Sequence, residues 1–229
     1  MRKSISLILI IVLVGLIDAM TSCKKQDHND STDTYGKISD IDGNLYDTVR
    51  IGLQTWMVQN LKVIHFSNGD PLLYSTNYIN DNAYCNYLDD EKKATIYGRL
   101  YNWSAVTDNR NICPYGWHVP TIEDWEELRD FLGGESIAGR ALKEEGTNHW
   151  LSPNDATNSS GYTALPGGMH DEDSFESLGY GCFIWSSSWE YLPHNPGPIF
   201  SYIYAYYPSL ELGKGNTYYY LSIRCIKNR

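Results

Sequence analysis

The chain has 229 residues, of which 42% are hydrophobic and 20% charged, a composition that can bury a core and excludes a wholly disordered protein. Its formal net charge is -10, and because an acidic chain without a basic patch repels phosphate backbones, nucleic acid is excluded as a partner. The aromatic content of 14% includes 19 tyrosines and 7 tryptophans, which is the unusual feature of the composition.

Residues 1–22 are predicted to be a targeting segment. Arg2 and Lys3 precede an apolar run at 5–17, which suits a signal peptide and is too short to span a bilayer comfortably. The sequence Met-Thr-Ser-Cys that ends at Cys23 resembles the signal of bacterial lipoproteins, in which the cysteine becomes the acylated first residue. We therefore expect lipidation of Cys23 and a membrane anchor; the alternative is a secretory signal with an incidental cysteine.

Residues 23–39 are polar and nearly free of large apolar groups, which predicts a flexible tether before a single domain at 40–229. The alternative for this segment is an ordinary frayed N-terminus. Asp27 and Asp30 after the predicted lipidation site favour exposure on the outer surface. The expected location is therefore the bacterial cell envelope, with lipid anchoring in the outer membrane.

Four cysteines follow the anchor, at positions 85, 113, 182 and 225. An exported protein can form disulfides, and an even count fits two of them. Three pairings are possible, and the spacing alone does not choose among them.

The first half of the domain predicts one strand pair followed by loops. Apolar and polar residues alternate over 45–51, a turn follows at 52–54, and 55–58 is predicted to return as the second strand. Residues 67–95 are rich in Asn, Asp and Tyr without a clear period, and we expect loops there.

Two helices are predicted in the middle of the chain. Thr121 and Asp124 have the spacing of a capping box, apolar residues then recur at helical spacing, and Gly133-Gly134 ends the pattern. A second helix is expected over 136–145. The acidic residues early in the first helix are interpreted as a solvated face favoured by the helix dipole, in preference to a catalytic cluster.

The last third of the chain is predicted to form short aromatic strands. They lie near 182–187, 199–207 and 218–226, and Leu221, Ile223 and Cys225 share one face of the last. A strand pair, two helices, turn-rich loops and late strands together predict an α+β fold with a mainly antiparallel sheet.

Several motifs together resemble the Fibrobacter succinogenes major paralogous domain family. They lie at 42–46, 51–57, 98–106, 113–121, 124–128, 161–168, 185–187 and 223–225, and the resemblance covers about 40–227. The sequence departs from the family at 154–158, which lacks the usual glycine, and at 219–222, which reads Tyr-Tyr-Leu-Ser instead of containing a Gly-Phe-Ser run.

This resemblance implies a C-type-lectin-like fold in a family common among secreted and lipid-anchored proteins of Bacteroidetes and without an established activity. In that fold two helices pack on a loop-rich sheet, and a cysteine near the first helix pairs with one in the last strand. The resemblance therefore implies a Cys113–Cys225 disulfide. With that pairing, Cys85 and Cys182 are predicted to form the second one.

The function expected from these observations is non-catalytic binding or adhesion at the cell envelope, with a polysaccharide or a surface protein as ligand. Aromatic rings stack on sugars and supply rigid contacts with proteins. The candidate ligand-binding residues are Trp189, Glu190, Tyr202, Tyr204 and Tyr206. The alternative is that these aromatic residues only fill strand faces.

The alternative function is an enzyme distantly related to the formylglycine-generating enzymes, which use thiols near the C-terminal part of a similar domain. Two disulfides would leave no thiol for that chemistry, and two free thiols would restore the possibility. No residue is assigned a catalytic role. Asp171 and Asp173 are the candidate ligands for a structural calcium ion, and no other metal or cofactor is expected.

Overall fold

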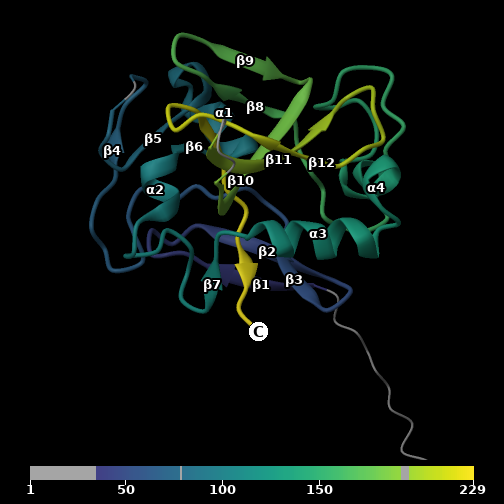
Figure 1. Ribbon diagram of the computed structural model, residues 1–229, viewed down its shortest axis with the longest axis horizontal. Helices are drawn as coiled ribbons and strands as arrows, with labels where there is room; N and C mark the ends of the chain where they lie inside the picture. The colour runs from purple at the N-terminus through teal and green to yellow at the C-terminus, as the bar shows by residue number, and fades with distance from the viewer. Residues whose placement is uncertain (1–34, 78, 192–195) are drawn as a thin grey trace, which may run out of the picture. The chain divides into compact units, whose positions relative to one another are not determined.

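The computed structural model describes residues 35–77, 79–191 and 196–229 (Figure 1). The predicted signal peptide, Cys23 and most of the predicted tether lie outside the described residues. Two β-sheets and four α-helices make up the described part of the chain. None of these helices is both long enough and apolar enough to cross a membrane.

The smaller sheet has five strands in the order β1-β2-β3-β14-β7. The predicted strand pair is confirmed as β2 and β3, which are antiparallel and place Val49 opposite Trp56. The bounds of the five strands are β1 (Tyr35–Ser39), β2 (Leu45–Ile51), β3 (Gln54–Met57), β7 (Trp117–His118) and β14 (Ile226–Lys227).

Strand β1 corrects the predicted extent of the tether. Residues 35–39 pair antiparallel with β2, and Ile38 packs against the buried core. The segment looked polar in the sequence because only one face of this edge strand contacts the protein, so a single apolar residue suffices for its packing. Residues 35–39 therefore belong to the folded part of the chain.

The larger sheet has nine strands and is mixed. Its order is β12-β11-β10-β8-β13-β6-β5-β4, with β9 paired to β8. Strand β10 runs parallel to both β8 and β13, so the expectation of a mainly antiparallel sheet holds only in part. The bounds are β4 (Leu73–Tyr74), β5 (Ala83–Cys85), β6 (Leu100–Asn102), β8 (Gly167–His170), β9 (Phe175–Leu178), β10 (Gly181–Glu190), β11 (Gly197–Tyr204), β12 (Glu211–Lys214) and β13 (Tyr220–Ser222).

The two predicted helices are α3 (Ile122–Phe131) and α4 (Glu135–Leu142). The capping box is confirmed: the Thr121 hydroxyl accepts from the Asp124 N–H, and the Asp124 carboxylate accepts from the Thr121 N–H. Helix α4 ends earlier than predicted because Lys143 adopts an extended conformation and forms a β-bridge with Ala164.

Two shorter helices, α1 (Glu91–Tyr97) and α2 (Trp103–Thr107), were not predicted. Each begins at one polar cap: Asp90 accepts from the Lys92 N–H, and Asn102 accepts from the Ala105 N–H. Helices of seven and five residues are too short to show an apolar period. The expectation of loops over 67–95 is therefore wrong for β4, β5 and most of α1.

Helices α3 and α4 complete a core shared by the two sheets. In Figure 1, α3 runs between the β2–β3 hairpin and the β10–β12 strands. Trp125 of α3 meets Trp56 of β3 with ring centroids 4.9 Å apart, and both belong to one buried cluster with Ile184 and Ile203 of the large sheet. Apolar burial of one face of α3 against residues of both sheets thus holds the sheets together.

The Cys113–Cys225 disulfide is present, with Cα atoms 6.0 Å apart. The second predicted disulfide is wrong, because Cys85 and Cys182 are both free and buried. Cys85 lies in β5 and Cys182 in β10, with β13 and β6 between them. Three strand spacings amount to about 14 Å, about twice the longest Cα separation that a disulfide spans.

The disulfide assignment predicts two thiols among residues 35–229. Cys85 and Cys182 should react with a thiol reagent only after unfolding, since both are buried, and a Cys85→Ser/Cys182→Ser variant should show none. Replacing Cys113 and Cys225 by serine should lower the free energy of unfolding by about 4–5 kcal/mol in urea, because a long loop is no longer closed. A loss near zero, or no thiols in the unreduced chain, would contradict the assignment.

His118 predicts a pH-dependent contribution to stability. Its two ring nitrogens face the Asp124 carboxylate at 3.0 Å and the Asn228 side-chain oxygen at 2.6 Å, and the bond to Asp124 raises its pKa. The stabilisation is therefore complete below the unfolded pKa of about 6.5 and is lost as pH rises through the folded pKa. Urea unfolding should show His118→Gln to be more destabilising at pH 5 than at pH 9; an equal effect at both would contradict this.

Candidate functional site

Five tyrosines gather at the end of β11 and form what we call the tyrosine surface: Tyr180, Tyr202, Tyr204, Tyr206 and Tyr207. The Tyr180 and Tyr204 rings stack with centroids 4.9 Å apart and planes 26° from parallel. Tyr206 and Tyr207 are 49% and 54% exposed. The structure therefore brings together three predicted binding residues, Tyr202, Tyr204 and Tyr206, in a partly exposed aromatic group.

The rings of Tyr202 and Tyr204 continue the aromatic side of the large sheet. Tyr202 lies opposite Phe183 in the strand register, and the Phe183 ring meets the Tyr204 ring edge to face at 5.7 Å. The Tyr202 hydroxyl donates to Glu211 at 2.5 Å, and burial together with this bond raises its pKa to about 12. Tyr202 therefore keeps its proton at neutral pH, and its ring is fixed in place.

Lys143 holds the chain segment that carries the exposed rings. Its side chain is fully buried, and its ammonium group donates to the carbonyls of Ala205 and Tyr207, each at 3.0 Å, and to Asp155 at 3.2 Å. Burial lowers the pKa of this ammonium. A buried cation surrounded by carbonyl oxygens fixes the backbone from 204 to 207 and with it the base of the tyrosine surface.

The other two predicted binding residues lie elsewhere. Trp189 and Glu190 occupy the opposite end of β10, where Trp189 pairs with Pro198. Eight strand positions separate Trp189 from Gly181, which lies opposite Tyr204, a distance of about 26 Å. Trp189 packs partly buried against Trp103, and Glu190 forms an ion pair with Lys214 at 3.0 Å. These two residues are therefore not part of the tyrosine surface.

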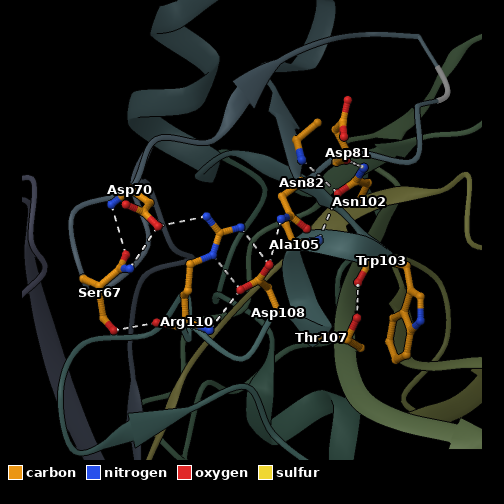
Figure 2. Close-up of polar contacts among 12 residues, drawn as sticks. Ser67, Asp70, Asp81, Asn82, Asn102, Trp103, Ala105, Thr107, Asp108 and Arg110 are labelled. Atoms are coloured by element: carbon orange, nitrogen blue, oxygen red, sulfur yellow. Dashed lines mark hydrogen bonds and ion pairs between the residues drawn. The ribbon is translucent and has the colours of Figure 1, made fainter.

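A polar network fixes the loops around α2 and Trp103, as Figure 2 shows. Arg110 forms ion pairs with Asp108 at 2.8 Å and Asp70 at 3.0 Å, and its guanidinium lies over the Phe66 ring. The bond from Arg110 lowers the pKa of Asp108 to about 2. The charges of Arg110, Asp108 and Asp70 are thus paired with one another, and these ion pairs stabilise the loops.

The two free thiols are not arranged for catalysis. Cys85 and Cys182 lie in different apolar clusters, and burial raises the pKa of both, that of Cys182 to about 11. A thiolate is the reactive form, and neither environment favours it. A formylglycine-type enzyme would need two free thiols, and the described residues contain two. Their separation and their burial, however, do not support that chemistry.

Of the two predicted calcium ligands, Asp171 has structural partners. The Asp171 carboxylate accepts from the N–H groups of Asp173 and Ser174 and so shapes the turn between β8 and β9. Within the described ranges, no three His, Cys, Asp or Glu side chains are grouped to hold a metal ion.

Sequence reasoning missed Tyr180, Tyr207 and Lys143. Tyr180 precedes β10 and reaches the surface only through the pairing of β10 with β11. Tyr202, Tyr204 and Tyr206 were identified because they occupy every second position of a strand, and Tyr207 falls outside that spacing. Lys143 had the appearance of a basic residue at a helix C-terminus, which the helix dipole favours.

Lys143→Met should destabilise the domain and disorder the tyrosine surface. The carbonyls of Ala205 and Tyr207 lose a buried donor, which should lower the free energy of unfolding by about 3 kcal/mol and speed amide exchange at Tyr207. Asp155→Asn is the comparison variant, because it removes the counter-charge of the buried ammonium group but leaves the bonds to the carbonyls intact, so it should destabilise the domain less than Lys143→Met does. Equal effects of the two variants would contradict the role of Lys143.

Comparison with curated proteins and with solved structures finds no match. The model of the Fibrobacter succinogenes major domain matches residues 49–227. That match includes β3, α1 to α4, the disulfide and the whole tyrosine surface. By this match over most of its length, the chain belongs to the Fibrobacter succinogenes major domain family.

Proposed function

We propose that this protein is a non-catalytic binding module of the bacterial cell envelope and that its tyrosine surface binds carbohydrate. The observation that carries the proposal is the group of five tyrosines at the end of β11, in which stacked, fixed rings lie beside two half-exposed ones. Flat aromatic faces match the C–H faces of sugar rings, and phenol hydroxyls bond to sugar hydroxyls.

The way in which the surface is built supports binding. Tyr202 is fixed by Glu211, and the backbone of 204–207 is fixed by Lys143. Rings that are ordered before binding lose little conformational entropy when a ligand binds, so less of the favourable contact energy is offset and the affinity is higher. A protein ligand would use the same rings and is the second ligand class to test.

The cell-envelope location is part of the same proposal. Its support is the lipoprotein-like sequence that ends at Cys23, which provides a lipid anchor, and the polar residues that follow. The C-type-lectin-like character of the fold is likewise proposed. It is supported by the order of the motifs and by the Cys113–Cys225 bridge between the segment before α3 and the last strands.

A glycan array tests the tyrosine surface. The unlipidated mature chain should bind at least one neutral glycan or wall polysaccharide, and Tyr206→Ala/Tyr207→Ala should weaken that binding about tenfold or more, as expected when contact residues at the centre of a binding surface are truncated. Both side chains are about half exposed, so the variant should remain folded.

Tyr115→Ala is the matched control, because Tyr115 is 97% exposed and belongs to a different part of the chain. It should bind as the wild type does. A wild-type protein that binds no glycan, or a double variant that binds as well as the control, would contradict the carbohydrate proposal. Binding to a surface protein that is lost in the double variant would favour the second ligand class.

A further inference from the structure

A separate pocket of about 420 Å³ opens between the tip of the β2–β3 hairpin, the end of α3 and the loop 158–161. It shares no residue with the tyrosine surface. Its volume lies within the range of small-molecule sites in proteins. The lining residues that matter here are Arg50, Gly52, Phe131 and Ser159.

Phe131 provides an aromatic wall. Its side chain is 62% exposed although it is large and apolar. The ring rests against Gly52, where a Cβ atom would come within 2.9 Å of the Phe131 Cδ2. Gly52 also has a φ of +60°, a conformation that side chains rarely adopt. The hairpin turn therefore needs glycine at this position, and the absent side chain leaves space for the ring.

Arg50 provides an unpaired cation beside that ring. Its Nε donates to the Gly52 carbonyl at 3.3 Å, so the same turn that supports Phe131 also orients the guanidinium. Among the described residues Arg50 has no ion pair, and its two terminal nitrogens have no hydrogen-bond partner. The chain has a net charge of -10, yet Arg50 has no carboxylate partner in the described part of it. Both terminal nitrogens of its guanidinium are therefore available to donate hydrogen bonds to an anion.

The opposite wall is ordered without a ligand. Asn158 bonds twice to Thr163, through its Oδ1 and its Nδ2, and this closes the loop on itself. The buried Arg224 donates to the Tyr162 and Thr163 carbonyls from below. Ser159 lines the pocket and is exposed, and its hydroxyl accepts a hydrogen bond from the Thr157 hydroxyl at 3.2 Å.

We infer that this pocket binds the uronic acid residue of an acidic polysaccharide. A sugar ring would stack on Phe131, its carboxylate would take the two terminal nitrogens of Arg50, and a ring hydroxyl would meet Ser159. A small inorganic anion would use the arginine but not the aromatic wall, and a neutral sugar would use the wall but not the arginine. Of these three ligands, only a carboxylate-bearing sugar uses both groups, and the inference does not depend on the tyrosine surface.

The test is a titration, by calorimetry or NMR, of the unlipidated mature chain with digalacturonate and with its neutral counterpart, galactobiose. Digalacturonate should bind at least about tenfold more tightly than galactobiose, and added salt should reduce the difference. Arg50→Gln should remove the preference for the acid, and Phe131→Ala should weaken both sugars. Both residues are exposed, so each variant should keep the wild-type circular dichroism spectrum.

Two controls show whether the preference for the acid arises at this pocket. Arg229→Gln removes one exposed cation outside the pocket and should leave the preference for the acid unchanged. Tyr206→Ala/Tyr207→Ala should also leave it unchanged, so a failed tyrosine surface and a failed pocket give different results.

Three outcomes would overturn the inference. One is equal affinity for the two sugars, or no binding of digalacturonate at millimolar concentration. Another is an Arg50→Gln variant that binds digalacturonate like the wild type. The third is tighter binding of triaspartate than of digalacturonate at this pocket, which would favour an acidic protein segment as the ligand.

Discussion

The segment from Tyr220 to Lys227, which contains β13 and β14, joins the two sheets. Strand β13 belongs to the large sheet and β14 to the small one, with Arg224 and the disulfide-bonded Cys225 between them. Arg224 is 1% exposed, and its guanidinium is satisfied by the Asn60 side chain, two backbone carbonyls and the face of Tyr162. A buried cation that lost these partners would be very costly, so this geometry constrains everything packed around it.

Both candidate binding surfaces depend on buried cations of this kind. Arg224 fixes the carbonyls at the base of the loop 158–163, one wall of the Arg50–Phe131 pocket, while Lys143 fixes the carbonyls of 204–207 beneath the tyrosine surface. In each case a buried cation satisfies the backbone of an irregular segment, which would otherwise carry unpaired polar groups. The segment 204–207, anchored in this way, can present exposed aromatic rings without losing order.

Local patterns in the sequence predicted the features that depend on neighbouring residues. The Thr121–Asp124 spacing located α3, and alternation over 45–51 located β2. Features that depend on distant contacts could not be predicted from the sequence. An even number of cysteines does not show which of them lie close together in the fold, so the predicted pairing of Cys85 with Cys182 was wrong. The alternating tyrosines of β11 pointed to the surface, whereas Tyr180 joins it only through strand pairing, and neither Arg50 nor Phe131 stood out as a candidate in the sequence.

Native-state hydrogen exchange measures the central claim that the C-terminal segment joins the sheets. The amides of Met57 and Leu61 donate to the carbonyls of Cys225 and Ile223, so they report on this junction directly. They should exchange only through global unfolding, with the same free energy of opening as the buried Leu128 in α3. Exchange of Met57 and Leu61 through a local opening of lower free energy than that of Leu128 would contradict the account.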